Sequence, residues 1–374
     1  MKPLRILVLG GYGNFGARIV RSMAQDAGIQ LVVGGRDAQR ATALAQATGP
    51  AIEALRVDAA DADLPSVLRR HGIGLVIHTA GPFQAQGYGV ALACAQAGCH
   101  YTDLADGRRF VCDFPVALHE HFLRAGRTAI SGASTVPALS SAVVDHLTKG
   151  WQGIHTVDIC IAPAQTAPRG VATLEAVLGY CGAPIPVWRD GQWVQAYGWE
   201  TPCRETFARM PPRLGALCDV PDLEIFPLHY RVRNRVMFHA ALEVPLSQKA
   251  FAWIAKVRRW GWLRQPQRLA PWLHRFAPLF DRWGSALGGM VVRVGGLDAQ
   301  GVARTAAWHI SADHDHGPEI PTMPALLFAR RLARGADLPL GAHTATGLLS
   351  LGDFQGEFAR WGMVTDEEVN HAGA

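Results

Sequence analysis

The sequence lacks closely spaced cysteine pairs. Its seven cysteines form an odd set without any CxxC motif, so no cysteine pair supports a zinc site. Unpaired cysteines are typical of proteins in a reducing compartment. We therefore expect a cytoplasmic protein without disulfides.

Long hydrophobic runs are also missing. Before the first glycines the N-terminus offers just four strongly apolar residues, Ile6 to Leu9, which is too short for a signal peptide. Residues 71–102 contain no Asp, Glu, Lys or Arg, but Gly, Gln, His and Pro interrupt them, so they do not predict a membrane span. With 49% hydrophobic and 18% charged residues, the composition is typical of a globular enzyme.

Acidic residues are nearly absent from residues 247–285, which hold eight Lys or Arg and one acid, Asp281. Because the basic excess is confined to this segment, it does not indicate nucleic-acid binding. Apolar residues recur here at helical spacing opposite Arg268, Arg275 and Arg282. They are Leu269, Trp272, Leu273, Phe276, Leu279, Phe280, Trp283 and Leu287.

This pattern predicts an amphipathic helix that Pro266, Pro271 and Pro278 break into short pieces. Its aromatic and basic character suits peripheral contact with a membrane surface, or a lid over an apolar substrate. The alternative is a set of short helices that pack on a second domain with their arginines in water.

The first 135 residues alternate short apolar runs with helical patterns, which predicts a Rossmann domain with a doubly wound parallel sheet. The expected strands are Leu4–Leu9, Gln30–Gly34, Ile52–Val57, Leu75–Thr79, His100–Leu104 and Thr128–Ser131. Residues 136–340 predict an α+β domain with a mixed sheet, the expected substrate domain. Its expected strands and hairpins are His155–Ala162, Val187–Val194, Arg231–Val244 and Met290–Ile310. Residues 341–374 are expected to pack back on the Rossmann domain.

A glycine motif follows the first strand and opens an apolar helix, the context of a dinucleotide-binding loop. Small residues there let backbone amides approach a pyrophosphate, and the helix N-terminus favours its negative charge. The expected cofactor-binding residues are Gly10, Gly11, Tyr12, Gly13, Asn14, Phe15 and Gly16.

Twenty residues after Gly16, the second strand ends in Gly35-Arg36-Asp37. An arginine at this place accommodates the 2′-phosphate of NADP, whereas a carboxylate accepts from the ribose of NAD. Arg36, helped by Arg40, therefore predicts NADP. The alternative is that Asp37 contacts the ribose and Arg36 is solvated.

Two further loops at the same sheet edge are candidates for cofactor contacts. Residues Thr79, Ala80, Gly81 and Pro82 follow the fourth strand, and their backbone should pass near the nicotinamide ribose. Asp58 follows the third strand and either meets the adenine or caps the entry to a helix.

Several stretches resemble the saccharopine dehydrogenase NADP-binding domain over roughly residues 4–150. They are the opening LVLGGYGNFGARIV, Gly34–Arg36, Val76–Asp106 and Ser131–Ser141, with a looser likeness in Ser285–Gly296 and Gly317–Gly335. The resemblance implies a pyridine nucleotide and a C-terminal mixed-sheet domain that often forms a homodimer. It also implies hydride transfer at a C=N, C–N or activated C=C bond. Members of the family act on many substrates, so the resemblance does not identify the substrate of this chain.

Tyr101 and Asp103 are the candidate catalytic residues, because a hydride acceptor also gains a proton and these side chains can supply or guide one. The alternative is structural: Tyr101 packs between layers, and Asp103 holds the loop that begins at Ala105.

The run His309, Asp313, His314, Asp315 and His316 contains metal-ligand types, but it precedes Gly317-Pro318 and fits a solvated turn better. We therefore expect no metal site. No GxSxG motif supports a serine hydrolase. Two function classes follow: an NADP-dependent oxidoreductase acting on a small molecule, or a low-turnover NADP-binding protein apposed to a membrane or serving as a scaffold.

Overall fold

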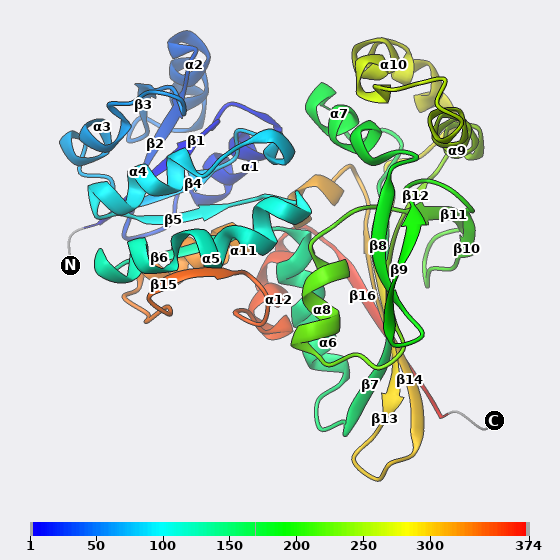
Figure 1. Cartoon of the computed structure of the whole chain (residues 1–374). Helices are drawn as coiled ribbons and strands as arrows, with labels where there is room; N and C mark the ends of the chain where they lie inside the picture. The colour runs from blue at the N-terminus through cyan, green and yellow to red at the C-terminus, as the bar shows by residue number, and fades with distance from the viewer. Residues whose placement is uncertain (1–2, 169, 372–374) are drawn as a thin grey trace. The chain divides into compact units, whose positions relative to one another are not determined.

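The computed structural model describes residues 3–168 and 170–371, and they form two compact units (Figure 1). Unit 1 comprises the chain up to Leu139 together with Glu319–Leu349. Unit 2 comprises Ser140–Pro318 and the residues from Ser350 onward.

Unit 1 is built on a seven-stranded parallel sheet in the order β15-β6-β5-β4-β1-β2-β3. The strands are β1 Leu4–Leu9, β2 Ile29–Gly35, β3 Glu53–Arg56, β4 Leu75–His78, β5 His100–Asp103, β6 Thr128–Ser131 and β15 Gly341–Thr344. The helices are α1 Asn14–Met23, α2 Ala38–Thr48, α3 Leu64–Arg70, α4 Gly89–Ala97, α5 Arg108–Arg124 and α11 Met323–Ala333, with the short turns η1 Phe83–Ala85, η2 Thr135–Leu139 and η5 Gly317–Thr322.

The order of strands reverses between β1 and β4, which are neighbours although they are not consecutive. In open α/β sheets, ligands bind at such a reversal, outside the carboxyl ends of the strands. The inner strands carry apolar residues that are buried on both faces, such as Ile6–Leu9. Each of the six strands expected in this domain is present, and the doubly wound prediction is confirmed.

The chain returns to unit 1 after leaving it, and this differs from the expected domain division. The first stretch of unit 1 ends at Leu139, close to the expected boundary at residue 135. Helix α11, expected in the second domain, contacts α1, and β15 pairs with β6. Residues from Ser350 onward do not belong to unit 1, because their strand β16 (Val364–His371) pairs with β14 (Ala303–Ala312) in unit 2.

Unit 2 carries a nine-stranded mixed sheet whose main path is β10-β11-β12-β7-β13-β14-β16. Its remaining strands are β7 Gly153–Ala162, β8 Pro184–Arg189, β9 Gln192–Tyr197, β10 Cys203–Glu205, β11 Arg213–Leu217, β12 Arg235–Leu242 and β13 Gly288–Leu297. Its helices are α6 Ser140–Leu147, α7 Val171–Tyr180, α8 Asp222–His229, α9 Pro245–Arg259, α10 Ala270–Phe276 and α12 Leu351–Arg360, with η3 Pro266–Leu269 and η4 Ala277–Trp283. Helices α6 and α8 pack on this sheet, and the predicted mixed-sheet domain is confirmed.

Turn chemistry explains both predicted hairpins. Asp190 and Gly191 have φ of 53° and 74°, the left-handed conformations that a tight two-residue turn between β8 and β9 requires. Between β13 and β14, the Asp298 carboxylate accepts hydrogen bonds from the amides of Gln300 and Val302, at 2.9 Å each. Both hairpins form where the sequence predicts them.

The basic segment forms the short pieces expected from its prolines. Each of Pro266, Pro271 and Pro278 lies in the first turn of η3, α10 or η4, where a missing amide costs little. Large apolar side chains of the segment lie in solvent, and Trp262 is 80% exposed. The other strongly exposed ones are Trp253, Trp260, Trp272, Leu279 and Trp283.

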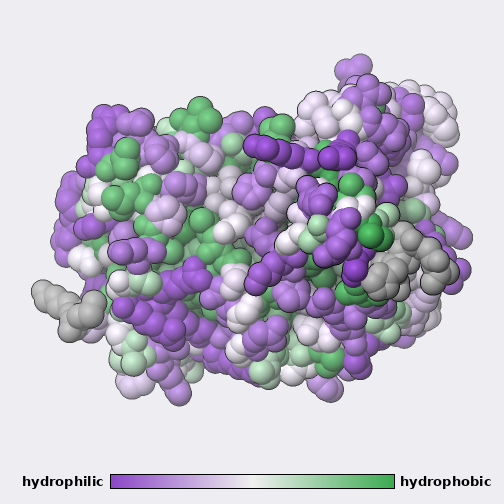
Figure 2. Space-filling model, turned by 90° about the horizontal axis from the view of Figure 1, so that it is seen from below, coloured by the Kyte–Doolittle hydropathy of each residue, from purple (hydrophilic) through white to green (hydrophobic). Residues whose placement is uncertain are grey.

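None of the helices within residues 3–168 and 170–371 combines the length and the apolar character needed to cross a membrane. On the face of the molecule in Figure 2, hydrophobic residues are scattered in small groups among hydrophilic ones. Such scattering is ordinary for a protein surface.

Candidate functional site

The glycine loop between β1 and α1 is held by close backbone contacts. Gly10 has a φ of +82°, which disfavours any side chain. A Cβ on Gly16 would lie 2.8 Å from Gly11 Cα and 2.8 Å from Thr79 Oγ1, so a larger residue would push α1 away from the loop. Gly13 precedes α1 and has no side chain to cap it, which leaves the first amides of the helix available to an anion.

Tyr12 lies across the end of β2 and connects the glycine loop to α2. Its hydroxyl accepts a hydrogen bond from the Asp37 amide at 3.0 Å. Gly35 leaves room for the ring, because a Cβ there would lie 2.7 Å from the Tyr12 hydroxyl oxygen. The Arg40 guanidinium stacks over the Tyr12 ring at 4.6 Å from its centroid.

Arg36 and Asp37 are the two candidates for the contact with the cofactor ribose, and they have different surroundings. Asp37 is the N-cap of α2, and its carboxylate accepts from the Arg40 amide at 3.0 Å. Arg36 is exposed and forms no ion pair among the described residues. The Arg36 guanidinium is therefore free to meet an anion, while one oxygen of Asp37 is already used.

Asp58 is exposed beyond β3, and its carboxylate accepts from the Ala60 amide at 3.1 Å. This bond lies in the turn before α3, whose N-cap is Asp63, so Asp58 does not cap the helix. The adenine contact stays a prediction.

The loop after β4 is fixed to the glycine loop. Thr79 Oγ1 donates to the carbonyls of Leu9 and Gly10, at 3.0 and 3.1 Å. Gln86 Nε2 donates to the carbonyls of Ala80 and Pro82, at 2.7 and 2.9 Å. Two of the predicted cofactor-binding stretches, the glycine loop and the loop that contains Gly81, thus meet at the reversal between β1 and β4.

Tyr101 is 2% exposed and stacks on Phe114. Its hydroxyl lies 3.1 Å from His78 Nδ1, at the end of the neighbouring strand. Burial lowers the pKa of His78 to about 4, so the imidazole is neutral at pH 7. His78 was not predicted as a partner of Tyr101, although its position at the end of β4, beside β5, was a usable signal.

Asp103 is completely buried and joins the ends of β5 and β6. Its Oδ1 accepts from the Gly132 amide at 2.8 Å, the Ala105 amide at 3.0 Å and the Ser131 hydroxyl at 3.0 Å. Burial raises the pKa of Asp103 to about 6, although these hydrogen bonds favour the anion. The contacts show that Asp103 holds both loops, which is the structural alternative; its role in catalysis stays a prediction.

The run from His309 to His316 is not gathered into a metal-ligand group within the part of the chain that the structure describes. His309 Nδ1 accepts from the Ala208 amide, Asp315 accepts from Thr166, and His316 Nδ1 bonds the Trp361 carbonyl. A different group, Cys203, Glu205 and His239, has the spacing that a metal ion needs. Sequence reasoning missed it, because these residues are brought together only by strand pairing.

The strand reversal, the glycine loop and the exposed arginine define the class of unit 1, a dinucleotide-binding Rossmann domain. Residues 6–130 match the family described as the saccharopine dehydrogenase NADP binding domain. Residues 6–130 thus carry a match to this NADP-binding domain, as the sequence resemblance predicts.

A protein of Mycobacterium tuberculosis named "Putative trans-acting enoyl reductase" is 31% identical over 109 residues. That alignment covers 28% of this chain and 26% of the relative, so the likeness spans about a quarter of the curated protein.

Two solved structures share the fold over both units. Saccharopine dehydrogenase (L-Glu forming) from Saccharomyces cerevisiae has a TM-score of 0.71 at 13% identity, covering 98% of this chain and 99% of that chain. Homospermidine synthase from Legionella pneumophila, solved with NAD, has a TM-score of 0.60 at 10% identity, covering 100% and 92%. At these identities the likeness establishes the fold alone.

Proposed function

We propose that this protein is an NADP(H)-dependent oxidoreductase that transfers hydride to or from a small molecule at a C=N, C–N or activated C=C bond. The observation that carries the choice of NADP is Arg36, exposed and without an ion pair among the described residues at the end of β2. A guanidinium there would pair with a 2′-phosphate. The capping role of Asp37 supports the same choice, because it occupies part of the carboxylate that NAD would use.

The residues of unit 1 fit a dinucleotide. The uncapped N-terminus of α1 would hold the pyrophosphate, and the loop from Thr79 to Pro82 would flank the nicotinamide ribose. Bound NADPH supplies the hydride. The protein's part is to position the cofactor and to exclude water from the acceptor.

We further propose Tyr101 as the proton donor and Asp103 as the residue that positions it at the end of β5. The neutral His78 beside the Tyr101 hydroxyl supports a proton-transfer role. The burial of both Tyr101 and Asp103 supports the structural alternative equally well. Turnover of a Tyr101 variant separates the two.

Cofactor titration followed by a substrate panel tests the proposal. NADPH and NADH are titrated separately while protein fluorescence is recorded, and tighter binding of NADPH is expected. Oxidation of NADPH is then followed by the loss of its near-ultraviolet absorbance, with imines and activated alkenes, including apolar ones, as substrates. Equal affinities would contradict the NADP assignment, and a lack of oxidation across the panel would favour the low-turnover alternative.

A second candidate function is contact with an anionic membrane surface through the segment that contains α9, η3, α10 and η4. Its exposed tryptophans and its basic side chains support this, since aromatic rings insert at the interface and cations meet anionic lipid. The competing role, a lid over an apolar substrate, would leave liposome binding absent. We also propose a homodimer, on the strength of the family resemblance, and light scattering of the purified chain would test it.

A further inference from the structure

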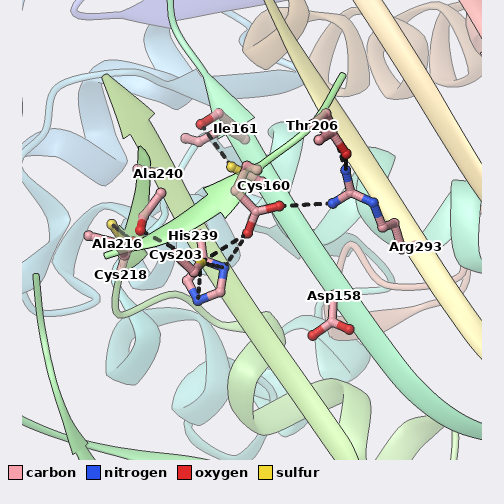
Figure 3. A network of polar contacts seen from close by, with 12 residues as sticks. Asp158, Cys160, Ile161, Cys203, Thr206, Ala216, Cys218, His239, Ala240 and Arg293 are labelled. Carbon is pink, nitrogen blue, oxygen red and sulfur yellow. Dashed lines mark hydrogen bonds and ion pairs between the residues drawn. The ribbon is translucent and has the colours of Figure 1, made fainter. Parts of the chain in front are cut away.

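Three side chains of the unit 2 sheet converge on one another outside the nucleotide site. Cys203 Sγ lies 3.3 Å from Glu205 Oε1 and 3.5 Å from His239 Nδ1, and Glu205 Oε1 lies 2.8 Å from His239 Nδ1. Figure 3 shows Cys203 and His239 pointing toward each other from different strands. All three are partly or largely buried.

Strand register places them on one face of the sheet. Cys203 and Glu205 lie two residues apart on β10, so they point to the same side. Cys203 pairs with Gly215 on β11, and Leu217, two residues along β11, pairs with His239 on β12. The three side chains therefore come from the first and third strands of a local antiparallel ladder.

Strand β11, which lies between β10 and β12, leaves space for the three side chains. Gly215 on β11 carries no side chain, and a Cβ there would lie 2.8 Å from Glu205 Cγ and 3.1 Å from His239 Cβ. The Glu205 side chain can therefore extend over β11 to reach His239. A residue larger than glycine would push the two side chains apart.

One carboxylate oxygen of Glu205 is already anchored, and the other faces the cluster. Arg293 Nη1 donates to Glu205 Oε2 at 2.9 Å, and the guanidinium is itself held by the carbonyl and hydroxyl of Thr206 (Figure 3). Such outer contacts orient metal-ligating carboxylates in known sites. They leave Oε1 turned toward Cys203 and His239.

The spacing is close to that of a tetrahedral zinc centre. Usual bond lengths place a sulfur ligand about 3.6 Å from a nitrogen or oxygen ligand, and nitrogen about 3.3 Å from oxygen. The observed 3.5 and 3.3 Å from Cys203 Sγ fit these values. The separation between Glu205 Oε1 and His239 Nδ1, 2.8 Å, is that of a hydrogen bond and would open by about half an ångström on binding.

We propose that Cys203, Glu205 and His239 form a three-ligand site for Zn²⁺ or a similar borderline divalent cation. Thiolate, imidazole and carboxylate are ligands that zinc accepts, and three protein ligands leave a fourth position for water or another small ligand. On binding, the Cys203 thiol releases its proton to solvent, and the His239 proton is carried on Nε2 so that Nδ1 donates its lone pair to the metal. This proposal departs from the expectation of a protein without a metal site, which no observation yet contradicts.

Cobalt binding to the full chain tests the proposal. The purified protein is stripped with a chelator and titrated with Co²⁺, whose bond to a thiolate gives a charge-transfer absorption in the near ultraviolet. We expect this band to saturate at one equivalent and to disappear on adding Zn²⁺. Absence of the band at saturating Co²⁺ would overturn the proposal.

Variants assign the ligands. Cys203→Ser should abolish the charge-transfer band, whereas Cys218→Ser should retain it, because Cys218 Sγ contacts the Ala216 carbonyl at 3.6 Å and lies outside the cluster. Glu205→Gln and His239→Gln keep the thiol but should each weaken Co²⁺ binding at least as much as the roughly tenfold loss typical of outer-shell changes. A band of unchanged strength in Cys203→Ser would refute the assignment.

Loss of the fold is distinguished from loss of the metal by two further readouts. Circular dichroism and NADPH affinity of each variant should match those of the unmodified protein. If Cys203→Ser does not fold, the His239→Gln variant decides: Co²⁺ affinity equal to that of the unmodified chain would refute the proposal, and a loss of about tenfold or more would support it.

Discussion

The Tyr12 hydroxyl and the Asp37 backbone amide form a 3.0 Å hydrogen bond that joins the glycine loop to the N-terminus of α2. Arg40, one turn into that helix, stacks on the same ring. Tyr12 thereby fixes the backbone on either side of Arg36, the residue on which the proposed choice of cofactor depends.

Replacing Arg36 with Ala should weaken NADPH binding by about tenfold or more, since a charge-assisted hydrogen bond contributes roughly 1.5–3 kcal/mol. NADH binding should stay within a few fold, because NADH lacks the phosphate. Raised salt should reduce the difference between the NADPH and NADH affinities of the unmodified protein. Fluorescence titration with both cofactors measures this, with Arg189→Ala, an exposed arginine of β8, as the matched control. Equal losses of affinity for the two cofactors would show that Arg36 does not contact the 2′-phosphate on the ribose.

Two substitutions of Tyr12 should separate its hydrogen bond from its ring. Tyr12→Phe keeps the surface under Arg40 and should retain the preference for NADPH. Tyr12→Ala removes that surface, worth about 0.5–1 kcal/mol at an exposed site, and should reduce the preference by roughly two- to fivefold. The same titrations measure both, and an equal preference in the two variants would contradict a role for the ring.

Replacing Tyr101 with Phe should lower turnover by on the order of 100-fold if the hydroxyl donates the proton. Cofactor affinity should change little, because Tyr101 packs inside unit 1 against Phe114. His78 Nδ1 would lose its partner, at a cost of about 1–3 kcal/mol in the free energy of unfolding. Steady-state kinetics and urea unfolding are both needed: unaltered turnover in a folded variant would leave Tyr101 with a packing role.

Asp103 should make the stability of the protein depend on pH in a recognisable direction. Burial raises its pKa from 3.8 to about 6 in the folded state, so between these values the folded protein binds more protons than the unfolded chain. The contribution of Asp103 to the free energy of unfolding therefore falls as the pH rises, mostly between pH 4 and 6, and the fall over the whole titration is about 3 kcal/mol. Burial lowers the pKa of His78 from 6.5 to about 4, a shift of similar size that acts in the opposite direction and offsets this slope in the unmodified protein.

Comparison with Asp103→Asn isolates the effect. The free energy of unfolding of the unmodified protein minus that of the variant should fall as the pH rises from 4 to 6 and should be constant above 7. Urea unfolding at several pH values measures it, and Asp113→Asn, an exposed carboxylate of α5, provides the control. A constant difference across the range would show that Asp103 titrates normally.

The exposed tryptophans of the basic segment should mediate liposome binding. Flotation with vesicles rich in phosphatidylserine at low salt should recover the protein, and raised salt should reduce recovery. A double variant, Trp262→Ser with Trp272→Ser, should lose most of the binding. Trp193→Ser, which changes an exposed tryptophan of β9, should keep it. If the unmodified protein fails to float, the membrane contact is wrong and the lid is the better interpretation.

Local patterns were enough to predict most of unit 1. The strand Leu4–Leu9 is present with the bounds that its apolar run predicts, and the glycine motif opens α1 as expected. These features follow from short-range rules: a buried parallel strand requires continuous apolar residues, and a close backbone approach requires glycine. The turn at Asp190-Gly191 belongs to the same group, since its conformation depends on two adjacent residues.

Non-local pairing could not be predicted in the same way. The strand β15 (Gly341–Thr344) is just four residues long, and it enters the unit 1 sheet because β6 offers an edge. Neither β10 nor β11 has a pattern long enough to identify, and β16 holds three consecutive acidic residues on an edge of the second sheet. In each case the partner strand, which is distant in sequence, supplies the hydrogen bonds that make the strand stable.

The sequence by itself determined the nucleotide loop and the doubly wound sheet, because both depend on residues that are neighbours along the chain. Tertiary structure alone decided which distant groups meet: Tyr101 with His78, and Cys203 with His239 across Gly215. The physical reason is that sheet register, set by hydrogen bonding and burial over whole strands, places side chains with an accuracy that no local propensity encodes.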